Sequence, residues 1–235
     1  MSSSSSFSSF FVIFGVVMVI VVVAGFFQAK RNRERTQALV AYAAARGFLF
    51  HPDGTGLEDR FGGEPFQRGR RRRATQVLEG THRGWPFVAF DYSYVTSNGK
   101  SSTTHQFSVV SLHLGVRTPM LQVRPQSAFG RFFSDAFGTD YHIGFPPFDD
   151  AFHIRTDSTD LVHDVLNEAF CRRLLAAPDR ALRFEGDSLL LFRSGRHDPA
   201  EVDAVLAQGS ELLALVPAAV WDRLRGVGGP TDAPL

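Results

Sequence analysis

The chain has 235 residues with 25 basic and 24 acidic side chains, which gives a formal net charge of +1. None of these charges falls in residues 1–27, whereas the rest of the chain has the charge content of a soluble domain. The 44% hydrophobic content, which includes 23 Phe, excludes intrinsic disorder for that part. The single cysteine, Cys171, excludes an intramolecular disulfide framework and a cysteine-based zinc site.

The first segment is strongly apolar. Residues 1–9 form a serine-rich tail, and residues 10–27 contain no charged or polar side chain. A helix of this length rises about 27 Å at ~1.5 Å per residue, which is close to the ~30 Å thickness of a bilayer core. The sequence therefore predicts a transmembrane helix over residues 10–27, with the lipid bilayer as its partner.

A cleaved secretory signal is the alternative for this segment, and it would make the protein a secreted one. Such signals begin with basic residues and have an apolar stretch of about 7–15 residues. Here no Lys or Arg precedes the apolar run, and the run is longer. Residues 23–25 (Val-Ala-Gly) only weakly resemble a cleavage site. The retained anchor is the favoured interpretation.

The charges that flank the apolar segment predict its orientation. Four basic residues follow it closely, opposed only by Glu34, and none precedes it: Lys30, Arg31, Arg33 and Arg35. Basic flanks stay on the cytoplasmic side of a membrane. We therefore expect a single-pass protein of the plasma membrane whose body is cytoplasmic.

The next segments divide into a stalk and a body. Residues 28–47 are expected to form a basic juxtamembrane helix that ends at Gly47, because residues 35–46 are rich in Ala. Residues 48–66 hold many Gly, Asp and Pro and predict an irregular linker with brief strands. The α+β body is expected to span residues 48–226, followed by a flexible tail over residues 227–235.

A run of β-type segments follows the linker. Residues 97–100 (Ser-Asn-Gly-Lys) form a strong hairpin signal, because Asn-Gly accepts the positive φ of a tight turn. Val88, Phe90, Tyr92 and Tyr94 alternate and should share one face of their strand. The pattern predicts a four-stranded antiparallel meander, with strands at residues 74–78, 87–95, 103–114 and 121–123.

The second half of the chain mixes helices and strands. Helices are predicted over residues 129–137, over 161–176 with Asp157 as cap, and from Asp198 onward with a kink at Pro217. A hairpin is predicted from residues 181–185 and 189–193. The expected fold class is α+β: an N-terminal transmembrane helix followed by an antiparallel meander with helices packed on it.

No catalytic motif is present in the sequence. Residues 99–101 (Gly-Lys-Ser) resemble the end of a phosphate-binding loop, but Tyr94 occupies the position of its first glycine. The eight histidines lack metal-ligand spacing, and no nucleophile-elbow pattern occurs. The sequence thus assigns no catalytic residue, cofactor or metal, and it favours a protein that is not an enzyme.

One polar cluster keeps an enzyme as the alternative. The densest polar and aromatic groups lie on two strands expected to pair across the hairpin: Asp91, Tyr92, Tyr94 and His105. They would have to meet in one pocket near the membrane. Ordinary cross-strand pairs on a half-exposed sheet face are the favoured interpretation.

Charge is unevenly distributed along the body. Residues 28–83 contain 12 basic and 6 acidic side chains, and residues 84–235 contain 13 and 18. The basic part includes a cluster of five arginines, namely Arg68, Arg70, Arg71, Arg72 and Arg73. This cluster could protect a strand edge, bind anionic lipid headgroups or bind another anion. Nucleic acid is the least favoured partner, because the inner leaflet is the nearest polyanion to a tethered body.

Several segments carry a resemblance to a known group of proteins. They include AYAAARGFLF (41–50), RFGGEPFQRGRRRRATQVLEG (60–80), THQFSVVSLHL (104–114) and RFEGDSLLLFRSGR (183–196). The chain resembles an uncharacterised actinobacterial family with one N-terminal transmembrane helix and an α+β body of unknown function. The resemblance implies a membrane-anchored protein and brings no catalytic residues. The sequence as a whole favours an anchored, cytoplasmic interaction or scaffold module whose protein partner it does not identify.

Overall fold

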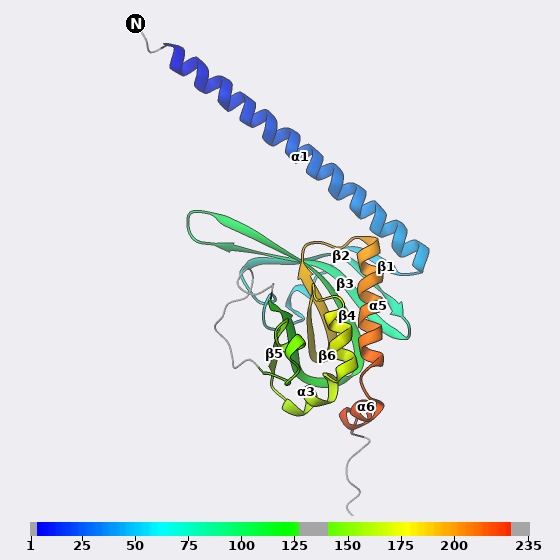
Figure 1. The fold of residues 1–235 in the computed structure, drawn as a ribbon. Coiled ribbons are helices and arrows are strands. Elements are labelled where there is room, and N and C mark those ends of the chain that lie inside the picture. Colours follow the sequence, from blue (N-terminus) through cyan, green and yellow to red (C-terminus); the bar gives the residue numbers. More distant parts are fainter. Residues whose placement is uncertain (1–3, 127–140, 227–235) are drawn as a thin grey trace, which may run out of the picture.

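The computed structural model describes residues 4–126 and 141–226, and the α+β fold expected from the sequence is confirmed (Figure 1). The expected helix at residues 129–137 and the tail at residues 227–235 lie outside the described residues. The strands are β1 (Leu49–Asp53), β2 (Arg70–His82), β3 (Trp85–Ser97), β4 (Ser102–Pro125), β5 (Phe152–Thr156) and β6 (Ala181–Ser194). The helices are α1 (Ser4–Arg46), the short 3-10 helix η1 (Leu57–Asp59), α2 (Pro146–Asp149), α3 (Thr159–Val165), α4 (Glu168–Leu175), α5 (Pro199–Ala214) and α6 (Ala218–Leu224).

Helix α1 joins the apolar segment and the stalk without a break. It starts at Ser4, inside the serine-rich segment, and runs to Arg46, after which Gly47 takes a positive φ of 69°. It is long and apolar enough in its N-terminal part to cross a membrane. Large apolar side chains of that part are exposed, with Phe14 at 57% and Phe27 at 56%.

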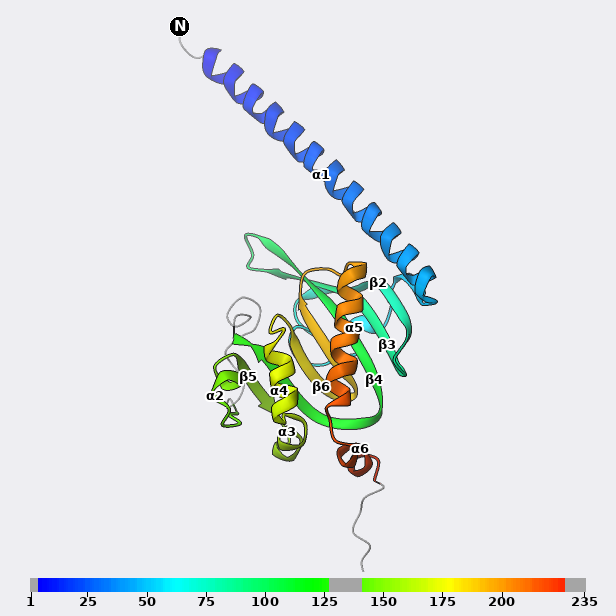
Figure 2. The same ribbon diagram turned by 45° about the vertical axis from the view of Figure 1, so that its right-hand side comes forward.

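The sheet is built around the predicted hairpin. Strands β2, β3 and β4 form an antiparallel meander, β1 pairs with the outer edge of β2, and both β5 and β6 pair with β4. The β3–β4 turn is held by the side chain of Asn98, which accepts hydrogen bonds from the backbone N–H groups of Lys100 (3.1 Å) and Ser101 (2.9 Å). The hairpin projects from the body in the same general direction as the N-terminal half of α1 (Figures 1 and 2).

The structure of β4 differs from the predicted four-stranded meander. The predicted strands at residues 103–114 and 121–123 are one strand of 24 residues. Gly115, with φ 68°, and Pro119 lie in two irregular stretches of its pairing with β6. Bulges accommodate a glycine with positive φ and a proline without ending a strand, so these residues bend β4 instead of dividing it.

Strand β6 replaces the predicted hairpin at residues 181–193. Leu182–Phe184 and Leu189–Ser194 both pair with β4, at its two ends, so the chain continues forward. Gly186 has φ 58° and opposes Thr118 at the irregular part of the ladder. The turn signal at residues 186–188 therefore marks the bend that β6 shares with β4.

The predicted helix at residues 161–176 is wrong as a single element. It is divided into α3 and α4, because Leu166 leaves the helical region with ψ 50° and Asn167 starts a new helix. The Asn167 side chain accepts a hydrogen bond from the N–H of Phe170 at 3.1 Å. Ser158, and not Asp157, caps α3. An Asn inside a helical pattern can favour a cap over continuation, and here it does.

The last two helices agree with the prediction. Asp198 caps α5 by accepting a hydrogen bond from the N–H of Glu201 at 2.8 Å, and Pro199 occupies the first turn. The chain bends by 85° between α5 and α6, and Pro217 lies in that break. Helix α5 lies lengthwise on the sheet (Figure 2).

The sheet separates two hydrophobic cores. On one face, α3–α6 and the end of α1 pack over alternate strand residues such as Phe87, Ala89 and Val110. On the other face, the segment between β1 and β2 folds over the sheet and buries Phe61 and Phe66 against the second set of alternate residues. Val88, Phe90, Tyr92 and Tyr94 all belong to this second core, which confirms that they share a face.

Candidate functional site

The C-terminal part of α1 is built into the body. Leu39 and Ala43 are 0% and 2% exposed within the helix-side core, although Val40 between them is 44% exposed. Burial of such apolar side chains stabilises the contact by about 1.5–3 kcal/mol for a leucine. The helix that carries the apolar segment is therefore also an element of the folded body.

Arg35 and Asp91 form the polar part of this junction. Nη1 of Arg35 lies 2.6 Å from Oδ2 of Asp91, whose side chain is 9% exposed, and it also donates to the backbone oxygen of His197 at 3.0 Å. The other carboxylate oxygen, Oδ1, accepts from the N–H of His197 at 2.9 Å. A single carboxylate on β3 thus connects α1 to the loop that precedes α5.

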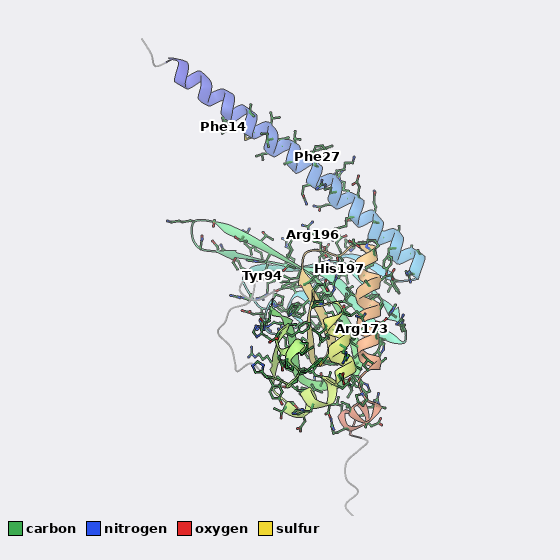
Figure 3. All side chains as sticks on the ribbon, in the orientation of Figure 1. Phe14, Phe27, Tyr94, Arg173, Arg196 and His197 are labelled. Carbon is green, nitrogen blue, oxygen red and sulfur yellow. The ribbon has the colours of Figure 1, made fainter. Side chains whose placement is uncertain are left out.

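Further contacts fix the helix along its length. Arg196 donates to Oδ1 of Asn32 at 2.7 Å, close to the apolar segment. At the other end, Asp203 of α5 accepts from Tyr42 at 2.9 Å and from Arg46 at 2.6 Å. These contacts hold α1 against both β3 and α5. Figure 3 shows Arg196 and His197 on the side of the body that faces α1.

His197 lies buried beneath this junction. Its side chain is 2% exposed, and Nε2 lies 2.9 Å from the backbone oxygen of Val109. A carbonyl can only accept, so Nε2 carries a proton, whereas the buried Nδ1 has no hydrogen-bond partner within the described residues. Burial lowers the pKa of His197, although the charge of Asp91 opposes the shift.

The structure does not bring the four residues of the polar cluster together. Asp91 lies on the helix side of the sheet, whereas Tyr92 and Tyr94 are buried in the second core on the opposite side. His105 stacks on Tyr94 with ring centroids 4.7 Å apart, and its Nε2 lies 2.9 Å from the hydroxyl of Thr96. Burial raises the pKa of Tyr92 to about 12. Adjacent strand residues point to opposite faces, so a pocket shared by Asp91 and the tyrosines does not form.

The basic residues divide into exposed and paired groups. Arg35, expected from the sequence as a lipid contact, pairs inside the protein with Asp91. Arg68 pairs with Glu64 at 2.6 Å and Arg72 with Asp59 at 2.8 Å. The exposed members of the set are Lys30, Arg31 and Arg33 on α1 and Arg70, Arg71 and Arg73 on β2, and of these Lys30 also pairs with Glu34 at 3.8 Å.

A polar cavity of about 340 Å³ lies between α1 and the sheet. Its walls come from α1, from strands β1 to β4 and from Arg196 before α5. The lining residues are Asn32, Arg35, Thr36, Pro52, Asp53, Thr75, Gln76, Asp91, Ser93, Gln106 and Arg196. We call it the junction cavity. The sequence did not reveal it, because its residues come from six separate segments.

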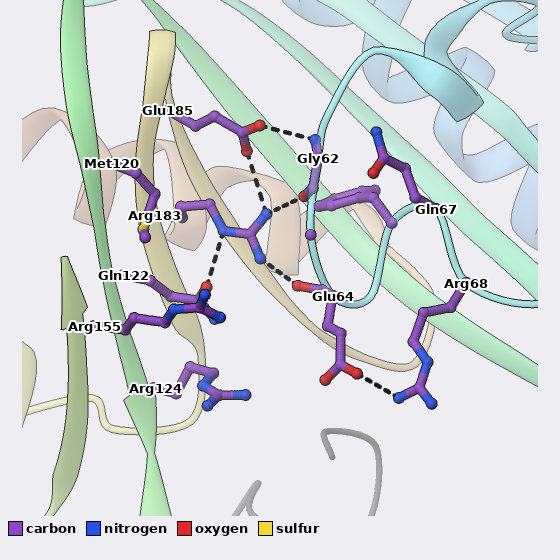
Figure 4. Close-up of a pocket in the computed structure, with 12 residues that line it drawn as sticks. Gly62, Glu64, Gln67, Arg68, Met120, Gln122, Arg124, Arg155, Arg183 and Glu185 are labelled. Atoms are coloured by element: carbon purple, nitrogen blue, oxygen red, sulfur yellow. Dashed lines mark hydrogen bonds and ion pairs between the residues drawn. The ribbon is translucent and has the colours of Figure 1, made fainter. Parts of the chain in front are cut away.

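A second cavity of about 650 Å³ lies on the other face of the sheet (Figure 4). Arg183, only 2% exposed, pins the loop above it by donating to the backbone oxygens of Gly62 and Glu64 and to Glu185 (3.2 Å). Its Nε donates to Gln122 at 3.2 Å. Burial lowers the pKa of Arg183, and Glu185 partly offsets this. We call this space the arginine cavity, because Arg68, Arg124 and Arg155 also line it.

The cysteine and the possible metal ligands were also located in the described part of the chain. Cys171 is fully buried, and burial raises the pKa of its thiol to about 12. Within residues 4–126 and 141–226, no group of three or more His, Cys, Asp or Glu side chains could hold a metal ion.

Comparison with known proteins identifies a solved structure with a similar fold. No family model and no curated protein sequence matches the chain. A solved structure that it resembles is the mycobacterial trehalose monomycolate transport factor A, TtfA, with a TM-score of 0.57 and 16% sequence identity. The likeness covers 79% of this chain and 97% of the TtfA chain in that structure. At this identity the likeness shows a shared fold alone, and the similar structure comes from an actinobacterium, as do the proteins that the sequence resembles.

Proposed function

We propose that this protein is a single-pass, membrane-anchored scaffold whose α+β body lies on the cytoplasmic face of the plasma membrane. The observation that carries the proposal is the continuity of α1, which holds the apolar segment at one end and packs into the body at the other. A flexible tether would let the body sample many orientations. Here the Arg35–Asp91 pair and the burial of Leu39 hold one orientation, which suits a module that presents a fixed surface to a membrane partner.

The charge next to the apolar segment supports the cytoplasmic orientation. Lys30, Arg31 and Arg33 are exposed directly after the segment, where the positive-inside rule expects them. In the β2–β3 ladder, Arg70 lies opposite Val95 and Arg73 lies opposite Ser93, on the stem of the β3–β4 hairpin. This hairpin extends along the same side of the body as α1 (Figure 1). Both groups could contact anionic headgroups, each basic residue contributing about 1 kcal/mol close to the surface.

The fold shared with TtfA supports a role connected with transport. TtfA is by its name a transport factor, and it has nearly the whole of its chain in common with this fold. We propose that this chain likewise serves as an accessory module for a membrane transport process. The enzyme alternative depended on a pocket shared by Asp91 and the two tyrosines. These side chains lie on opposite faces of the sheet, so no specific observation favours that alternative.

The orientation is tested by cysteine labelling in intact cells. Cys171 is fully buried, so the native thiol gives little background with a membrane-impermeant maleimide. Lys100→Cys on the exposed hairpin should label only after permeabilisation, whereas Ser5→Cys should label in intact cells. Labelling of Lys100→Cys in intact cells would show that the body is outside.

The scaffold role is tested by uncoupling the body from the anchor. A flexible Gly-Ser insertion after Arg31 keeps the apolar segment and the contacts from Arg35 onward but removes the fixed orientation. Protein partners captured from native membranes by crosslinking should be lost with this insertion. The same insertion after Asn98, in the exposed hairpin turn, is the matched control and should retain them. Equal recovery from both proteins contradicts a scaffold that depends on orientation.

A further inference from the structure

The junction cavity has a composition that selects a ligand class. Its four charged residues cancel, because Arg35 and Arg196 are balanced by Asp53 and Asp91. Among the uncharged residues that line it, Pro52 is the apolar one, and every other side chain carries an amide or a hydroxyl group. The volume of about 340 Å³ lies at the lower end of the ~300–1,000 Å³ of small-molecule sites. A neutral ligand that both donates and accepts hydrogen bonds fits this lining best.

Two buried polar atoms of the lining have no partner within the described protein. They are Nε of Arg35, a donor, and Oε1 of Gln76, an acceptor. Leaving a buried polar group without a hydrogen bond costs about 1–3 kcal/mol, so such groups usually have a partner. A hydroxyl group is a suitable partner for either atom, since it can accept from a donor and donate to an acceptor.

The backbone of Gln76 adds a second, independent observation. Gln76 has a φ of +56° and lies in the irregular stretch of β2–β3 pairing between Thr75 and Leu78. A non-glycine residue in this region is strained, and of the four such residues described, Gln67, Arg71, Gln76 and Arg83, Gln76 is the one that lines the cavity. The bulge directs a glutamine to the cavity at a position where glycine would be the relaxed choice.

The guanidinium groups of the cavity argue against an anionic ligand. Arg35 already pairs with Asp91 at 2.6 Å, and Arg196 donates to Gln106 at 2.8 Å and to Asn32 at 2.7 Å. A phosphate or carboxylate would have to displace these contacts. A ligand with several hydroxyl groups needs no such displacement.

The cavity also lies close to the expected bilayer surface. Asn32 follows the last apolar residue, Phe27, by five positions, which is about 7 Å along a helix. The headgroup layer on each side of the hydrocarbon core is about 5–8 Å thick. We propose that the junction cavity binds an uncharged, hydroxyl-rich group of the sugar type, presented by a lipid headgroup or free in solution. The headgroup source rests on the proposed membrane anchoring, whereas the ligand chemistry does not.

The test uses the full-length protein in phosphatidylcholine nanodiscs. One preparation contains a minor fraction of monoglucosyl diacylglycerol, a second contains phosphatidylglycerol, and a third receives free methyl glucoside in solution. Native mass spectrometry counts the bound molecules. Protein that does not enter the nanodiscs would contradict the anchoring itself, so the two proposals can fail separately.

The decisive variant is Gln76→Gly. It removes the acceptor and relieves the positive φ, so the protein should be at least as stable while glucoside binding falls about tenfold, the equivalent of one hydrogen bond of ~1.4 kcal/mol. The matched control is Gln67→Gly, because Gln67 is also a glutamine with a positive φ, 60°, but lies outside the junction cavity. This control should gain stability in the same way and keep binding unchanged.

The outcomes separate the sources. Retention of the glucosyl lipid alone supports a headgroup, and binding of methyl glucoside as well supports the same chemistry from solution, provided that Gln76→Gly weakens it. Preferential retention of phosphatidylglycerol, equal binding by Gln76→Gly and the native protein, or no binding of either glucoside would overturn the proposal.

Discussion

The carboxylate of Asp91 on β3 lies 2.6 Å from the guanidinium of Arg35 on α1. Arg35 is the last of the four basic residues that follow the apolar segment, and it is the one that the fold withdraws from the surface. The same carboxylate accepts from the backbone N–H of His197. This buried acid is therefore one of the groups that set the position of the body relative to its helix, together with the contacts of Leu39, Tyr42 and Arg46.

Removing this acid should destabilise the protein. Asp91→Ala leaves the N–H of His197 without its acceptor and the guanidinium of Arg35 without its counter-ion, which should lower the free energy of unfolding by about 3 kcal/mol. Arg35→Met with Asp91→Leu should cost less than the sum of the single changes. Urea denaturation of the full chain in detergent measures all of them. Additive effects would mean that the two side chains do not interact.

Neighbouring positions on α1 should respond in opposite ways. Leu39→Ala should cost about 2–4 kcal/mol, because the side chain is 0% exposed in the core. Val40→Ala, one residue later and 44% exposed, should change stability by less than about 0.5 kcal/mol. Thermal unfolding of both variants in the same detergent gives the comparison. Equal, small effects would show that this part of α1 does not pack on the body.

Gly209 tests the close packing of α5 on the sheet. A Cβ at this position would lie 2.4 Å from Cδ1 of Leu112 and 3.1 Å from Cδ1 of Leu191, both fully enclosed. Ala is favoured over Gly inside a helix by about 1 kcal/mol, so a stabilised variant would be expected from propensity alone. We expect Gly209→Ala to destabilise by about 1–3 kcal/mol instead. A stabilised variant would contradict this contact.

Because His197 is buried, we expect the free energy of unfolding to depend on pH. Its pKa is lower in the folded protein than the usual 6.5, because burial disfavours the charged ring. The unfolded chain therefore binds the proton more readily, and stability is lost as the pH falls below about 6.5, by up to ~1.4 kcal/mol per pH unit. His197→Gln keeps a donor for Val109 and should flatten this slope between pH 6.5 and 5. His51→Gln, which replaces an exposed histidine, is the control and should leave the slope unchanged.

The exposed arginines of β2 predict lipid binding that depends on charge. Replacing Arg70, Arg71 and Arg73 with Gln should weaken the binding of the protein to vesicles containing phosphatidylglycerol by about 3 kcal/mol at low salt. The control replaces Arg117, Arg172 and Arg225, which are also exposed but lie on other parts of the body. Vesicle flotation at two salt concentrations measures both sets. Equal losses of vesicle binding for the two triple variants would show that the net charge alone, and not the position of the arginines on β2, causes the effect.

Much of the fold could be predicted from local sequence. The apolar segment, the turn at residues 97–100, the alternation of Val88 to Tyr94 and the cap at Asp198 each depend on neighbouring residues. The predictions that the structure corrects are those in which a local sequence signal is compatible with two different structures. Asn167 could continue a helix or start one, and Gly186 could turn a hairpin or bend a strand; in both cases contacts with distant residues decided.

The candidate site could not be predicted in this way. The sequence identified Asp91, Tyr92, Tyr94 and His105 as a cluster because they are close along two paired strands, but alternation sends Asp91 to one face and the tyrosines to the other. The partners of Asp91 are Arg35 and His197, 56 and 106 positions away. No sequence pattern connects residues at such separations.

The sequence by itself determined the unequal distribution of charge: an uncharged apolar end, a basic region and an acidic remainder. Only the tertiary structure decided which of those charges face solvent and which are used inside. Local composition governs whether a segment can enter lipid or form a helix, since each residue contributes independently to that free energy. Pairing between Arg35 and Asp91 depends on the geometry of the whole sheet, which brings distant residues within 2.6 Å of each other.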